Sequence, residues 1–103
     1  MNICYVYILA SKDHKHLSVK AVPDLRHGVR QHRMRISRRL GKKRVYQKVV
    51  RVEKFAGLTG AVARERELEG WSRVRLIHLV SKTNPTWKPI SIRAYLGRMK
   101  QVG

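Results

Sequence analysis

The chain has 103 residues, a length that suits one domain with one modest hydrophobic core. Hydrophobic residues make up 43% of it, so we expect a folded protein rather than a disordered one. Lysine and arginine number 24 against 6 aspartates and glutamates, which gives a formal net charge of +18. A charge of this size attracts polyanions. Nucleic acid is therefore the leading candidate partner, and an acidic membrane surface comes second.

The apolar pattern and the cysteine content exclude several classes of protein. The longest uninterrupted apolar run, Cys4 to Ala10, is far shorter than the ~20 residues that a membrane-spanning helix needs. We expect no secretory signal, because no long apolar region with a cleavage site follows a basic leader. The single cysteine has no partner for an internal disulfide, which favours a reducing compartment. We therefore expect a cytoplasmic protein with no membrane partner.

The first part of the chain predicts a β-hairpin followed by a basic helix. Residues 3–10 are β-branched and aromatic, which is typical of a buried strand, and residues 16–22 pair back with them after a turn. Pro23 and Asp24 favour the first turn of a helix. Offsets of four, seven and eleven residues give this helix an inner face of Leu25, Val29, His32 and Ile36.

The second part predicts a third strand and two more helices. Residues 45–55 alternate as a strand does. Thr59 is a candidate N-cap for a helix that runs to about Gly70, and Ser72 is a candidate N-cap for the next helix. That helix should end near Asn84, which precedes a proline. The inner stripe of the first of these helices is predicted to be Leu58, Ala61, Val62 and Leu68.

The end of the chain is basic. Residues 86–103 contain no acid and only a short apolar stretch, so we interpret them as an extended basic tail. The predicted division is a domain at 1–88 and a basic C-terminal extension at 89–103.

Basic residues gather in two segments that lack acids. Between Leu25 and Val52 there are eleven lysines and arginines, and seven more follow Glu69. A solvated surface is one interpretation, but no nearby acid neutralises this charge, whereas phosphates would. Arginine predominates in the first segment, and its forked donors suit phosphate. We expect nucleic-acid contacts from Arg26, Arg30, Arg33, Arg35, Arg38, Arg39, Lys42, Lys43, Arg44, Lys48, Arg93, Arg98 and Lys100.

Five short segments carry a family resemblance. They read Tyr-Val-Tyr-Ile-Leu at 5–9, Asp-Leu at 24–25, Ala-Arg-Glu at 63–65, Trp-Ser at 71–72 and Asn-Pro-Thr-Trp at 84–87. Together they resemble the small stand-alone members of the GIY-YIG nuclease superfamily, over about residues 3–88. The resemblance implies an α/β (α+β) domain in which helices flank a central three-stranded antiparallel sheet.

The resemblance also implies a reaction, the cutting of a phosphodiester bond with Mg²⁺ or Mn²⁺. A glutamate holds the metal, an arginine steadies the phosphate, and tyrosines position or activate the attacking water. These roles are chemically sound, since a hard cation takes oxygen ligands and stabilises charge that grows in the transition state.

Compared residue by residue, the implied catalytic set is incomplete. Ser18 and Lys20 stand where the second motif has its tyrosine and glycine, and Gly28 stands where the family has its arginine. Each missing group typically contributes a hundredfold or more to the rate. We therefore expect no catalytic residues, only remnant positions of the site, which are Tyr5, Tyr7, Ser18, Lys20, Gly28, His32 and Glu65.

Glu65 is notable even without the resemblance, because its spacing puts a carboxylate on an apolar helix stripe. Buried carboxylates are uncommon unless they are paired or bound to metal. Pairing with a nearby arginine and metal binding both remain open.

A few other side chains are candidates for binding. His14 and His16 share one side of the hairpin, but with no third ligand in sight we interpret them as exposed hairpin histidines. Trp87 and Tyr95, in the predicted tail, are candidates to stack on unpaired bases.

The sequence thus predicts a non-catalytic protein that binds nucleic acid on a degenerate GIY-YIG scaffold. We favour structural binding of RNA, above all ribosomal RNA, in a ribosome or another ribonucleoprotein, beside neighbouring ribosomal proteins. No cofactor and no small-molecule substrate are expected. One alternative is a Mg²⁺- or Mn²⁺-dependent nuclease that uses Tyr5 or Tyr7, Lys20 and Glu65 in a rearranged site. Another is a basic partner of an acidic protein or membrane.

Overall fold

The computed structural model describes residues 2–40 and 47–101. Three strands, β1 (Cys4–Ser11), β2 (Leu17–Val22) and β3 (Gln47–Phe55), form one antiparallel sheet in the order β2-β1-β3. The helices are α1 (Leu25–Leu40), α2 (Leu58–Glu69), α3 (Arg73–Thr83) and α4 (Ile92–Gln101). The predicted α+β class with a three-stranded antiparallel sheet is confirmed. Within the described ranges, no helix is long and apolar enough to cross a membrane.

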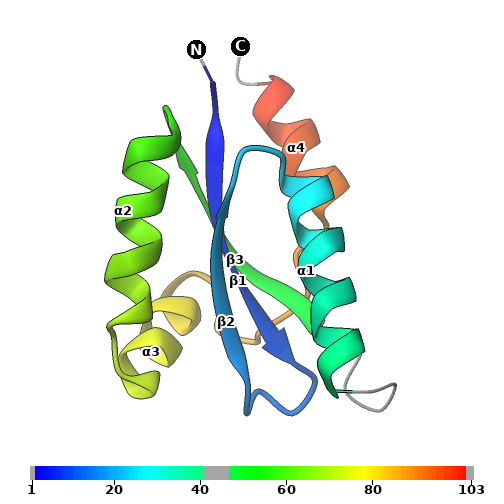
Figure 1. Ribbon diagram of the computed structural model, residues 1–103, viewed down its shortest axis with the longest axis vertical. Coiled ribbons are helices and arrows are strands. Elements are labelled where there is room, and N and C mark those ends of the chain that lie inside the picture. Colours follow the sequence, from blue (N-terminus) through cyan, green and yellow to red (C-terminus); the bar gives the residue numbers. More distant parts are fainter. Residues whose placement is uncertain (1, 41–46, 102–103) are drawn as a thin grey trace.

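The sheet lies between two layers of helices. Figure 1 shows α2 and α3 on one side of it and α1 and α4 on the other. Successive side chains of a strand point to opposite faces, so Tyr7 and Leu9 of β1 pack under α1, whereas Val6 and Ile8 pack against α2 and α3. Both faces of β1 are therefore buried, which explains why its sequence is continuously apolar.

The strand register brings the remnant positions near one another. Tyr7 pairs with Lys20 of β2 on one side and with Val52 of β3 on the other. A β-bulge lies opposite the step from Ile8 to Leu9, so that Val50 has no direct partner on β1. The bulge thus lies in the ladder that joins β3 to β1.

The prediction of an extended basic tail is wrong. Residues 92–101 form α4, and Ile92, Tyr95 and Leu96 pack against the core cluster that α1 also covers. The backbone N–H of Ile90 donates to the Val49 carbonyl at 2.8 Å, which joins the segment before α4 to β3. The spacing of these apolar residues by three and four gives a helix with one core-facing side. The described part of the segment predicted as an extension thus packs against the core through its apolar side.

Of the two helix starts predicted from N-cap residues, one differs from the structure and the other agrees with it. Helix α2 begins at Leu58 rather than after Thr59, and its N-cap is Gly57, whose φ of 138° favours glycine. Leu58 is 53% exposed and so does not belong to the inner stripe. The prediction for α3 is confirmed, because the Ser72 side chain accepts the backbone N–H of Arg75.

Candidate functional site

Four remnant positions meet between β1, β2 and α1. The Tyr7 hydroxyl lies 2.7 Å from His32 Nδ1, and the Ser18 hydroxyl lies 2.8 Å from His32 Nε2. The Tyr7 hydroxyl also donates to the Gly28 carbonyl at 3.4 Å. Tyr7 is fully buried and His32 is 8% exposed. The imidazole is thus held at both nitrogens inside the protein.

Burial keeps both aromatic groups uncharged. Burial, supported by the charges of Arg35 and Lys20, lowers the pKa of His32 to about 4, although Glu65 acts in the opposite direction. Burial also raises the pKa of the Tyr7 phenol well above its ordinary value, against the effect of Arg35 and Arg33. A general base works best when its pKa is near the working pH. Near neutral pH, these two groups are a phenol and a neutral imidazole that stabilise the fold by hydrogen bonds.

Gly28, where the resemblance implies an arginine, lies in close packing. A Cβ atom at Gly28 would lie 2.5 Å from Cγ1, 2.7 Å from Cβ and 2.9 Å from Cγ2 of Val22. Contacts this short leave no room for any side chain at position 28 unless α1 and β2 move apart.

The carboxylate of Glu65 lies beside strand β2. Its Oε1 accepts the backbone N–H of Ala21 at 2.7 Å, and β2 is an edge of the sheet. An edge strand leaves backbone donors without a partner strand, so Glu65 supplies an acceptor that the sheet lacks there. Pairing with a neighbouring arginine is not what the structure shows, since Arg64 binds Glu53 and Glu67 instead. The described residues include no group of three or more His, Cys, Asp or Glu side chains placed to hold a metal.

The remaining two remnant positions lie at the border of this group. Lys20 is exposed on β2 and is close enough to lower the pKa of His32. Tyr5 points toward α4, where its ring meets Tyr95 edge-on with centroids 6.3 Å apart. The structure therefore brings Tyr7, Ser18, Gly28 and His32 together and leaves Tyr5 outside.

The outer side of α1 is a basic surface. Five of its arginines are exposed, namely Arg26, Arg30, Arg35, Arg38 and Arg39. Arg33 differs, because it is half-buried and its Nε donates to the Gln47 carbonyl at 2.9 Å. Of the other predicted contacts, Lys48 is half-buried, Arg93 and Arg98 are exposed on α4, and Lys100 belongs to α4. Lys42, Lys43 and Arg44 lie outside the described residues.

The acids of the chain do not neutralise this helix. Among the described residues, every ion pair joins Glu53 or Glu67 to Arg51 or Arg64, on β3 and α2. Asp24 accepts the His27 backbone N–H at the start of α1, which stabilises the helix N-terminus. With respect to the residues that the structure describes, the five exposed arginines of α1 thus keep their charges free for an external anion.

The predicted role of Trp87 in base stacking is ruled out by its burial. Trp87 is 7% exposed, and its indole N–H donates to the Ser81 hydroxyl at 3.0 Å. The His14 ring packs on it with centroids 4.6 Å apart, so His14 is half-buried rather than exposed. Arg73 donates to the carbonyls of His14 and Lys15 and joins the hairpin to α3. Trp87 lies within the segment predicted as a tail, so the sequence gave no signal for this packing.

No protein-family model matches the chain, and neither does any of the curated proteins or solved structures with which it was compared. The relationship to the GIY-YIG superfamily therefore stays a prediction from the sequence.

Proposed function

We propose that this chain is a non-catalytic nucleic-acid-binding protein that binds RNA through the exposed arginines of α1. The observation that carries the proposal is a set of five arginines on one helix, Arg26, Arg30, Arg35, Arg38 and Arg39, which are exposed and outside every described ion pair. Neutralising such a group by phosphates releases counterions, which drives binding. The net charge of +18 supports a partner with a dense array of phosphates, such as a structured RNA.

The state of the remnant site supports binding without catalysis. Position 28 has no room for a phosphate-binding side chain. The His32 nitrogens are held by Tyr7 and Ser18, and one oxygen of Glu65 is held by the β2 backbone. Gly28 and Ser18 stand where the resemblance implies an arginine and a second tyrosine, which supports binding without the metal-dependent cleavage of the family.

The assembly that we propose is a ribosome or another ribonucleoprotein in the cytoplasm. Sedimentation of a lysate, before and after ribonuclease treatment, tests this placement. We expect the protein in a fast-sedimenting fraction that ribonuclease disperses. Sedimentation as a small particle without ribonuclease would overturn the assignment.

Cleavage assays test the alternative of an active nuclease. The purified protein is incubated with labelled RNA and DNA in Mg²⁺ or Mn²⁺, and Glu65→Ala is the matched variant. We expect RNA that is bound and intact for both proteins. Cleavage that the wild type performs and Glu65→Ala loses would contradict the non-catalytic proposal.

A further inference from the structure

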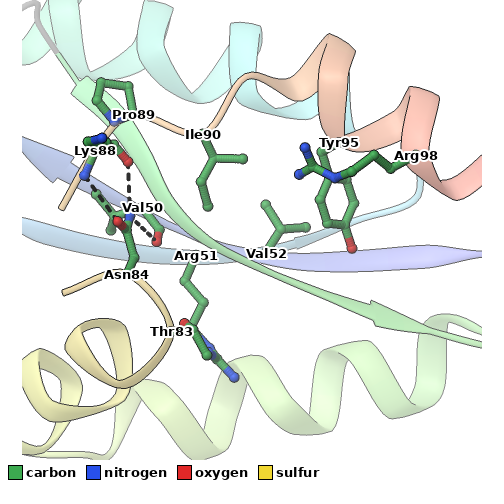
Figure 2. Close-up of a pocket in the computed structure, with 10 residues that line it drawn as sticks. All are labelled: Val50, Arg51, Val52, Thr83, Asn84, Lys88, Pro89, Ile90, Tyr95 and Arg98. Atoms are coloured by element: carbon green, nitrogen blue, oxygen red, sulfur yellow. Dashed lines mark hydrogen bonds between the residues drawn. The ribbon is translucent and has the colours of Figure 1, made fainter. Parts of the chain in front are cut away.

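A second basic site lies along β3, at the opposite edge of the sheet from β2 with its Ser18 and Lys20. It is a cavity of about 500 Å³, a size in the range of small-ligand sites. Figure 2 shows that Ile90 and Val52 form its apolar part, that Tyr95 and Arg98 reach it from α4, and that Arg51 and Thr83 lie beyond the strand. The cavity thus combines an aromatic ring, apolar side chains and cations.

The charge of this cavity is positive. Arg51, Lys88 and Arg98 are among the lining residues, and no carboxylate is. Arg51 is fixed, since it donates to Glu53 at 2.8 Å and to the Thr83 hydroxyl at 2.9 Å. Lys88 and Arg98 are exposed and take part in no described ion pair. Within the described part of the chain, the site therefore offers two cations outside ion pairs to an anionic ligand.

Hydrogen bonds hold the backbone around the cavity in place. The Asn84 side-chain amide donates to the carbonyls of Val50 and Lys88 and accepts the Lys88 N–H, as Figure 2 shows. The backbone N–H of Ile90 donates a hydrogen bond to the Val49 carbonyl. A peptide strand that paired with this part of β3 would have to break these bonds. They therefore favour a ligand held by side chains over one held by strand pairing.

We propose that this cavity binds one unpaired nucleotide of an RNA strand. The base packs against the Tyr95 ring beside Ile90, and Arg98 and Lys88 bind the phosphates that flank it. Tyr95 suits this role because it is half-exposed and its ring is held edge-on by Tyr5. The inference rests on the proposed function and adds to it a site for single-stranded RNA, separate from the phosphate contacts of α1.

The test compares affinities for three RNA probes by fluorescence anisotropy. The probes are a labelled hexauridylate, the same strand with abasic sugars in place of its nucleosides, and a blunt RNA duplex. The variants are Tyr95→Leu, Tyr95→Phe and Arg98→Gln, with Arg66→Gln as a control, since Arg66 is exposed on α2 and does not line the cavity. Tyr95→Phe keeps the ring, whereas Tyr95→Leu keeps only the apolar packing.

We expect Tyr95→Leu to weaken hexauridylate binding about tenfold, and Tyr95→Phe and Arg66→Gln to leave it within about twofold. Tyr95→Leu should leave binding of the abasic strand and of the duplex unchanged, while Arg98→Gln weakens both single strands. Equal losses of hexauridylate affinity with Tyr95→Leu and Tyr95→Phe, or no loss with either variant, would overturn the inference. Binding of the duplex would in that case still support the proposed function. A glutamate-rich peptide that bound this cavity more tightly than hexauridylate would also overturn it. Failure of the wild type to bind any of the RNAs would instead overturn the proposed function.

Discussion

Gly28 and Val22 are packed so closely that a Cβ atom added at Gly28 would lie 2.5 Å from Cγ1 of Val22. This contact sets the distance between α1 and β2. It also places the Gly28 carbonyl beside the Tyr7 hydroxyl. The same contact therefore leaves no room for a side chain at position 28, and it orients the helix that displays the basic surface.

Replacement of Gly28 tests this contact. We expect Gly28→Ala to lower the free energy of unfolding by about 1–3 kcal/mol, because the Cβ forces α1 away from β2. The matched control is Gly97→Ala on α4, where an added Cβ meets no atom within 4 Å. Removing that glycine from a helix should stabilise the protein by about 0.5–1 kcal/mol. Urea unfolding measures the free energy of unfolding of both variants. A Gly28→Ala protein as stable as the wild type would contradict the close packing.

The buried His32 predicts a pH dependence of stability. Its pKa is about 4 in the folded protein and about 6.5 in the unfolded chain. As the pH falls, His32 therefore takes up a proton in the unfolded chain before it does so in the folded protein. The contribution of neutral His32 to the free energy of unfolding is complete above pH 6.5 and is lost as the pH falls toward 4. We expect His32 to account for a loss of about 2–3 kcal/mol across this window.

Urea unfolding between pH 4 and 7.5 measures this effect. His14, whose pKa burial also lowers, contributes in the same direction, so the comparison that isolates His32 is wild type against His32→Gln. The variant should be less stable at pH 7 and should show a flatter pH profile. His27→Gln, at an exposed position of α1, controls for the loss of an imidazole. An unchanged profile in His32→Gln would refute the assignment.

The pair formed by Glu53 and Arg64 predicts a further difference in stability. The Glu53 carboxylate is 13% exposed and accepts hydrogen bonds from Arg64 at 2.8 Å and 3.1 Å and from Arg51 at 2.8 Å. Burial acts to raise the pKa of Glu53, but the bonds from the two arginines outweigh it and lower the pKa. We expect Glu53→Gln to cost about 1–3 kcal/mol.

The control for this pair is Glu67→Gln. Glu67 binds the same arginine, but its side chain is 54% exposed, so its loss should cost less than about 1 kcal/mol. Thermal unfolding compares the two variants, and equal effects would show that burial does not decide the strength of these pairs.

The sequence was sufficient to predict the elements whose pattern is local. The apolar run of β1 and the Ser72 cap of α3 follow from nearest neighbours along the chain. The predicted helical face of Leu25, Val29 and His32 is buried as expected. Contacts between distant residues were beyond such patterns. The bond from Ala21 to Glu65 and the packing of Trp87 on His14 depend on how α2 and the 84–90 segment dock.

The sequence likewise predicted some residues of the candidate site and missed others. Residue types were sufficient to single out the remnant positions and the arginines of α1. They were not sufficient to separate Arg33, which binds the Gln47 carbonyl, from its exposed neighbours. The sequence also did not predict the cavity at β3. Its lining comes from β3, the 83–90 segment and α4, and the residues of α4 were predicted to be extended.

The salt dependence of RNA affinity tests most directly whether the exposed arginines of α1 bind phosphates. Affinity for an RNA hairpin is measured over a range of salt for the wild type, for the triple variant Arg26→Gln, Arg30→Gln, Arg38→Gln, and for a charge-matched control. The control changes Lys12, Lys54 and Lys82 to glutamine, three exposed lysines that do not belong to α1. Because each phosphate contact adds about 0.7–0.9 to the slope of log affinity against log salt, the arginine variant should lose about 2–3 from that slope. The control should keep the wild-type slope, and an arginine variant with an unchanged slope and affinity would contradict the proposed function.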